Sequence, residues 1–208
     1  DSAEVIDLNQ SSPAWRTTSH MIHARHHAVA TVLPDGTVLV TGGTSSPGLN
    51  DASGAVMEPE VWDPATGDWT ALTPMTVKRL YHSSALLLPD ARVFVGGGGQ
   101  PNAAGEPDHF DAQLFSPPYL FNQDGTPADR PQIGDAPSDL QLTLIKLGSV
   151  THAYNQSQGF LKLRFSRGPN GLTATAPANA NLAQPGHYML FLVGTNGAPS
   201  VARIVHLG

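Results

Sequence analysis

The 208-residue sequence predicts an all-β fold, in which a partial kelch-type β-propeller of about two blades is followed by a small β-sandwich. Composition is the first observation behind this prediction, because 21 glycines and 18 prolines accompany only 13% charged residues. That balance favours turn-rich β-structure. The second observation is a repeat of strand-like segments in the first part of the chain. The third is a series of short apolar runs separated by turn residues in the remainder.

The repeat relates residues 24–43 (ARHHAVATVLPDGTVLVTGG) to residues 79–98 (RLYHSSALLLPDARVFVGGG), at an offset of 55 positions. Each copy contains an apolar run, a Pro-Asp turn, a second apolar run and a pair of glycines. Segments that combine a Glu-Val pair with a later tryptophan flank the first copy, at residues 4–15 and 60–69. This order of strands and turns is typical of a kelch-type propeller blade, whose repeat is about 50 residues long.

The Pro-Asp turns differ between the two copies. Asp35-Gly36 supplies the left-handed conformation that a tight hairpin needs, and apolar strands flank it. Asp90-Ala91 lacks the glycine. Because alanine tolerates a positive φ poorly, we expect the second hairpin to be either differently shaped or slightly strained.

The pattern changes after Arg130-Pro131. From about residue 140 onward, short strand-like runs alternate with turn signals, which predicts a small β-sandwich. The turn signals are Gly148, Asn170-Gly171, Pro185-Gly186 and Asn196-Gly197. We therefore expect propeller blades at residues 1–133 and a separate β-domain at residues 134–208.

Charge and composition argue against several kinds of partner. The net charge is -6 and the few lysines form no basic stripe, so we expect no nucleic-acid partner. No apolar run approaches the roughly 20 residues of a membrane span, so we expect no membrane partner. The sequence has no cysteine, which excludes disulfides and thiolate metal sites. Because it opens on Asp1-Ser2, we expect the chain to begin inside something longer or to have been processed.

Two short segments carry the residue types of a metal site, RLYHS at residues 79–83 and LGSVTHAYN at residues 147–155. A phenol from Tyr81 and imidazoles from His82 and His152 make a mixed oxygen and nitrogen ligand set. Such a set suits Cu(II), which heads the affinity order of divalent first-row metals for these ligands. In the simpler interpretation, Tyr81 is a core residue, His82 is merely hydrogen-bonded and His152 faces solvent from a loop.

A second group of histidines straddles the start of the first repeat. It consists of His20, His23, His26 and His27. Their spacing matches no standard metal site, and a histidine tract is only compositional evidence. His27 occupies in the first repeat the position of His82 in the second, so we expect it to line the same central channel of the propeller.

Four stretches of the sequence resemble the galactose oxidase and glyoxal oxidase group of copper radical oxidases. They are residues 79–99, 109–131, 144–160 and 176–204, and they follow the order found in that group. The resemblance implies a seven-bladed propeller with copper near its axis. It also implies an immunoglobulin-like C-terminal domain that extends a histidine-bearing loop down the central channel.

The resemblance further implies roles for the candidate residues. Tyr81 becomes the axial copper ligand and the base that takes the proton of the substrate hydroxyl, while His82 and His152 become the imidazole ligands. The implied reaction oxidises a primary alcohol or an aldehyde and reduces O2 to H2O2. The partners are then O2, an alcohol, aldehyde or carbohydrate substrate, and the remaining propeller blades from the parent chain or another chain. An extracellular location is implied by the resemblance alone.

The sequence departs from this group in two respects. The group's radical cofactor joins a tyrosine to a cysteine, and this chain has no cysteine. About two blades also do not close a ring. We therefore expect a fragment that lacks the radical pair. Two other functions stay open, namely a secreted carbohydrate-binding or adhesion module without catalysis and a metal site with altered, hydrolytic chemistry.

Overall fold

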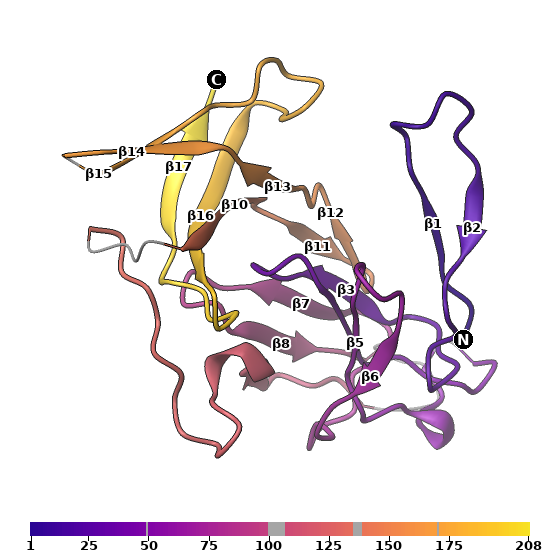
Figure 1. Cartoon of the computed structure of the whole chain (residues 1–208). Coiled ribbons are helices and arrows are strands. Elements are labelled where there is room, and N and C mark those ends of the chain that lie inside the picture. The colour runs from indigo at the N-terminus through magenta and orange to yellow at the C-terminus, as the bar shows by residue number, and fades with distance from the viewer. Residues whose placement is uncertain (49, 100–106, 135–138, 170) are drawn as a thin grey trace.

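The computed structural model describes residues 1–208 except 49, 100–106, 135–138 and 170 (Figure 1). In the described part, regular structure consists of β-strands and two short 3-10 helices, η1 (Ala52–Gly54) and η2 (Pro118–Leu120). The described residues include no helix long and apolar enough to cross a membrane. The predicted all-β architecture, a partial propeller followed by an immunoglobulin-like sandwich, is therefore confirmed.

The first part of the chain forms antiparallel blades. One blade has four strands in sequence order, β3 (Val29–Val32), β4 (Val38–Thr41), β5 (Glu60–Trp62) and β6 (Trp69–Ala71). The next has three, β7 (Ser83–Leu87), β8 (Val93–Gly97) and β9 (Ala112–Phe115). A hairpin of β1 (Glu4–Ile6) and β2 (Trp15–Thr17) stands apart from both blades (Figure 1). The paired strands β3–β4 and β7–β8 are those that the repeat predicts.

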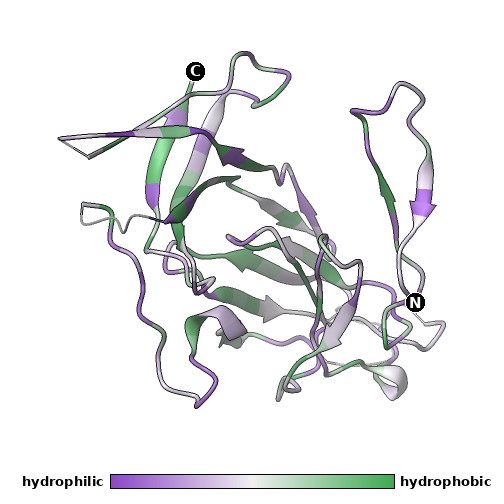
Figure 2. Cartoon of the chain, viewed as in Figure 1, coloured by the Kyte–Doolittle hydropathy of each residue, from purple (hydrophilic) through white to green (hydrophobic). Residues whose placement is uncertain are grey.

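The blades share one apolar core, because the inner strands alternate buried and less buried residues. Its buried members come from β3, β4, β7 and β8 and from the loops around them, and Figure 2 shows these strands as largely hydrophobic. They include Val29, Leu39, Ala85, Val93 and Val95. Ala153, from the second part of the chain, belongs to the same core. The two parts are therefore packed against each other.

The second part contains a four-stranded sheet in the order β13-β10-β16-β17. Its strands are β10 (Leu140–Lys146), β13 (Phe160–Leu163), β16 (Gly186–Gly194) and β17 (Arg203–Leu207). Two hairpins accompany it, β11 (Ser149–Thr151) with β12 (Tyr154–Gln156), and β14 (Phe165–Gly168) with β15 (Gly171–Ala174). The predicted boundary between residues 133 and 134 stays a prediction, and residues 135–138 beside it lie outside the described residues.

The two Pro-Asp turns have the same shape. In the first, the amide of Gly36 donates to the carbonyl of Leu33, and Gly36 has a φ of 93°. In the second, the amide of Ala91 donates to the carbonyl of Leu88, and Ala91 has a φ of 67°. Of the two alternatives expected for Asp90-Ala91, a different shape or a strained backbone, the structure shows the strained backbone. A left-handed alanine costs about 1–2 kcal/mol, and Ala91 is fully buried in a core that both parts share.

Hydrogen bonds hold the described residues that connect the two parts. The Arg130 guanidinium donates to the carbonyls of Pro199, Ser200 and Asp90. The Tyr119 hydroxyl donates to the carbonyl of Ala91 at 2.6 Å. Burial raises the pKa of Tyr119 well above its ordinary value, so this phenol stays a donor at physiological pH. These bonds fasten the connection to the second Pro-Asp turn.

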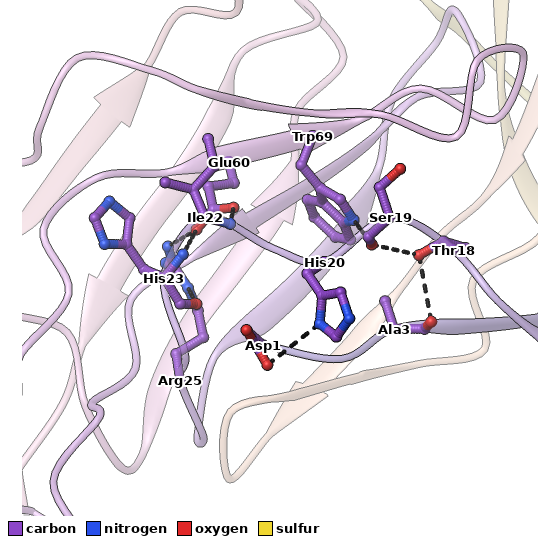
Figure 3. Close-up of polar contacts among 10 residues, drawn as sticks. All are labelled: Asp1, Ala3, Thr18, Ser19, His20, Ile22, His23, Arg25, Glu60 and Trp69. Carbon is purple, nitrogen blue, oxygen red and sulfur yellow. Dashed lines mark hydrogen bonds and ion pairs between the residues drawn. The ribbon is translucent and has the colours of Figure 1, made fainter.

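A buried ion pair holds the first complete blade to the segment before it (Figure 3). Arg25 and Glu60 are in direct contact and neither side chain is exposed. Glu60 also accepts from the amides of Ile22 at 2.7 Å and His23 at 3.1 Å. Burial lowers the pKa of Arg25, and the adjacent carboxylate of Glu60 opposes that shift. The pair therefore fixes the path of the chain into β3.

The next blade repeats this pair in a more open form. Arg79 is buried, and its guanidinium donates to the carbonyl of Gly97 at 2.8 Å and to the carboxylate of Asp111 at 3.2 Å. The Asp111 side chain is 54% exposed. Both blades therefore place an arginine ahead of the inner strand and an acid near the start of the third strand.

The contrast between these pairs predicts different costs for matched substitutions. Glu60→Gln leaves Arg25 buried without a counter-charge, so we expect a loss of about 3–5 kcal/mol in the free energy of unfolding. Asp111→Asn removes a half-exposed partner, and the buried Arg79 keeps its bond to the Gly97 carbonyl, so we expect a smaller loss than for Glu60→Gln. Urea denaturation of the two variants measures both values. Equal losses would contradict the assignment of the first pair as the structural one.

Candidate metal centre

The three aromatic side chains singled out in the sequence lie together. The ring centroids of Tyr81 and His82 are 3.9 Å apart, those of His82 and His152 are 4.9 Å apart, and those of Tyr81 and His152 are 5.8 Å apart. His82 and His152 are exposed and Tyr81 is half-buried. The site thus opens to solvent and joins residues from both parts of the chain. Their assignment as copper ligands stays a prediction.

Unusual backbone conformations determine the direction in which these rings point. Tyr81 and His82 form a turn just before β7, closed by a bond from the Ser83 amide to the Leu80 carbonyl at 3.0 Å. His82 has a φ of 63° and His152 a φ of 52°, both in the left-handed region. In a regular strand, neighbouring side chains would point to opposite faces. The turn allows Tyr81 and His82 to reach the same space.

A hydrogen bond also determines which ring nitrogen of His82 is available to a metal. Its Nδ1 lies 3.1 Å from the carbonyl oxygen of Gly99, which can only accept. In a neutral ring, the proton is therefore on Nδ1, and Nε2 carries the lone pair that a metal would bind. The Nδ1 of His152 lies 2.6 Å from the Thr151 hydroxyl, which can donate or accept. His82 is thus fixed in one tautomer, and His152 has a partner that permits the same one.

The β11–β12 hairpin carries His152 to the propeller, and it lies beside β3 and β7 (Figure 1). Its Asn155 amide donates to the carbonyl of Ala85 at 3.2 Å. Beyond β12, Gln158 accepts from the Val32 amide at 2.8 Å and donates to the Ala30 carbonyl at 2.9 Å. The hairpin is therefore bonded to the innermost strands of two neighbouring blades.

His27 adjoins the same cluster. Its ring centroid is 5.2 Å from that of Tyr81, and its φ is 56°, as at its repeat equivalent His82. The Nδ1 atoms of His26 and His27 are 2.9 Å apart, and His26 Nε2 lies 2.5 Å from the Ser46 carbonyl oxygen. His27 was not among the ligands predicted from the sequence. The 55-residue repeat, which makes His27 the equivalent of His82, is the feature of the sequence that indicates its position here.

The rest of the histidine tract is not part of this cluster. His20 faces Asp1 at 3.4 Å, and the backbone amide of His23 bonds to Glu60, as Figure 3 shows. Among the described residues, no group of three or more His, Cys, Asp or Glu could hold a metal ion. The candidate centre therefore depends on a tyrosine oxygen together with two imidazoles. That donor set fits Cu(II), and the accessible Nε2 of His82 fits a metal-binding role.

Comparisons with known proteins agree with the order of the two parts of the chain. A propeller part followed by an immunoglobulin-like domain defines a class of two-part β-proteins. Residues 1–119 match the family described as "Glyoxal oxidase N-terminus", and residues 124–207 match "Galactose oxidase-like, Early set domain". The chain belongs to the galactose oxidase and glyoxal oxidase family of copper radical oxidases.

Individual relatives support the same assignment. A galactose oxidase of Gibberella zeae is 33% identical over 99% of this chain and 33% of its own length. The aldehyde oxidase GLOX of Vitis pseudoreticulata is 32% identical over 94% of this chain and 43% of its own length. A solved structure titled "Novel fungal alcohol oxidase with catalytic diversity among the AA5 family, in complex with copper" superposes with a TM-score of 0.90 at 34% identity, covering 99% of this chain and 47% of that one. The chain thus spans less than half the length of these relatives.

The hairpin contacts predict how the cluster is held. Gln158→Ala removes both bonds to β3 and leaves the Val32 amide without its acceptor, so we expect a loss of about 1–3 kcal/mol in the free energy of unfolding. We also expect hydrogen exchange at the Val32 amide to accelerate. Gln156→Ala is the matched control, because this exposed glutamine at the end of β12 makes no such bond among the described residues. Unchanged Val32 exchange in Gln158→Ala would contradict the proposed anchoring.

Proposed function

We propose that this chain belongs to a copper-dependent oxidase that converts a primary alcohol or an aldehyde with O2 and releases H2O2. The observation that supports this proposal is that the rings of Tyr81 and His82 lie close to the ring of His152, which is about 70 positions later in the sequence. The overall reaction removes two electrons and two protons from the substrate and transfers them to O2. The radical Tyr-Cys pair of the family is not encoded in this chain, which has no cysteine.

The residues of this chain would divide the work. Bound copper would supply Lewis acidity and a one-electron couple. His82 and His152 would hold the ion through imidazole nitrogens, and the Nδ1 bond of His82 to Gly99 would orient its ring. Tyr81 as a phenolate would accept the proton of the substrate hydroxyl. His27 would lie against Tyr81 from the preceding blade.

Several features of the whole protein belong to the same proposal. We infer that further propeller blades, from the parent chain or another chain, complete the ring and provide the radical pair. The substrate is an alcohol, an aldehyde or a carbohydrate, in keeping with the names of the galactose, aldehyde and alcohol oxidases that the chain resembles. An extracellular location and the 1–133 and 134–208 domain division complete the proposal.

Copper titration of the 208-residue chain tests the proposed site. We expect electron paramagnetic resonance to detect a Cu(II) ion bound by the imidazoles of His82 and His152, and His82→Gln and His152→Gln each to lose the signal of that ion. Tyr81→Phe is expected to retain the ion but lose the phenolate-to-Cu(II) absorption band. His23→Gln, which removes a histidine outside the cluster, serves as the matched control. An unchanged Cu(II) signal in the His82→Gln, His152→Gln double variant would refute the site.

Peroxide release by the complete protein tests the reaction. Galactose, glyoxal and methylglyoxal are the substrates to compare. Copper at this site together with peroxide supports the oxidase. Copper at this site without peroxide supports a metal centre of altered, hydrolytic chemistry, and no stoichiometric copper at this site supports a carbohydrate-binding or adhesion module.

A further inference from the structure

A second exposed pair of imidazoles lies on the C-terminal sheet. His187 of β16 and His206 of β17 are directly opposite each other in the antiparallel register. Both residues are exposed, and their ring centroids are 4.9 Å apart at an interplanar angle of 59°. Residues directly opposite across an antiparallel pair have Cβ atoms about 4.5–5.5 Å apart, so both rings project from one face of the sheet.

The separation of this pair equals that of the candidate copper ligands. His82 and His152 also have ring centroids 4.9 Å apart, at an angle of 66°. The adjacent pair His26 and His27, at 4.5 Å, differs because its Nδ1 atoms face each other and His26 Nε2 faces a carbonyl. Within the described part of the chain, neither His187 nor His206 forms a side-chain hydrogen bond that would occupy its ring nitrogens.

Backbone pairing positions this second pair. β16 lies between β10 and β17, with paired residues on both sides. The carbonyl of His187 accepts from the Leu147 amide at 3.1 Å, which pins the backbone on the β10 side. Ligands on paired strands need little reorganisation to share one ion.

The lysine of the neighbouring strand β10 lies on the other face of the sheet. Lys146 pairs with Tyr188, the residue next to His187, so by strand alternation it belongs to the opposite face. Its ammonium is bonded to the Gln184 amide oxygen at 2.7 Å. The face that carries the two imidazoles therefore has no ammonium from the neighbouring strand at that position.

We propose that His187 and His206 form a second, bidentate site for a divalent transition-metal ion. Imidazole nitrogen suits copper, nickel and zinc, and Cu(II) binds most tightly among them. Two protein ligands leave the other coordination positions to water, so the ion is exchangeable. The site is separate from the Tyr81, His82 and His152 cluster, and it does not depend on the proposed oxidase function.

Titration of the metal-free chain with CuCl2 tests this site. The readouts are metal stoichiometry and paramagnetic broadening of backbone amide signals in 1H–15N spectra. We expect two Cu(II) ions per chain, with broadening at Leu147 and Ile204 beside the proposed pair and separately at Ser83 beside the first cluster. The His187→Gln, His206→Gln double variant should lose one ion and the broadening at Leu147 and Ile204, and keep that at Ser83.

Two further variants separate the possible causes. His20→Gln with His23→Gln removes the same number of histidines elsewhere and should keep both ions. His82→Gln with His152→Gln should lose only the broadening at Ser83, which tests the proposed oxidase site on its own. The second site is overturned if the wild-type chain shows no broadening at Leu147, or if that broadening persists without His187 and His206. Both positions are exposed, and the same spectra report whether each variant is folded.

Discussion

The attachment of the β11–β12 hairpin to the inner strands of two blades is the constraint on which the candidate centre depends. The side-chain amides of Gln158 and Asn155 bond to backbone groups of β3 and β7, respectively, as the backbone of a further strand would. Ala153 then lies in the propeller core, so the neighbouring His152 is delivered beside Tyr81 and His82. Polar bonds set the position of the hairpin and apolar burial holds it there.

The histidines at this site have a strained backbone. His27, His82 and His152 all adopt left-handed conformations, which cost about 1–2 kcal/mol each for residues with a Cβ. Two of them occupy equivalent positions of successive repeats, so the blade geometry itself generates the conformation. Strained residues of this kind persist where the surrounding structure determines them, and they gather at functional sites. The strain therefore distinguishes these three histidines from His20 and His23, whose backbones are not left-handed.

The sequence could predict whatever depends on local pattern. The 55-residue repeat predicted the inner strands, and the adjacency of Tyr81 and His82 placed both at the start of one of them. Contacts between distant residues do not follow from local pattern, and only the family resemblance placed His152 beside Tyr81 and His82. The bond from Val32 to Gln158 spans 126 positions, and no periodicity encodes it. The opposition of His187 and His206 likewise follows from the register of β16 with β17, which apolar alternation alone does not define.

Because the candidate ligands come from both parts of the chain, metal binding and docking are thermodynamically linked. Tyr81 and His82 belong to a blade, whereas His152 belongs to the hairpin that docks on it. An ion that binds all three stabilises the docked arrangement by the same free energy by which docking strengthens its binding. The second pair differs, since His187 and His206 lie within one sheet. Its affinity for metal is therefore independent of docking. A change that loosens the hairpin is expected to weaken metal binding at the first site and to leave metal binding at the second site unchanged.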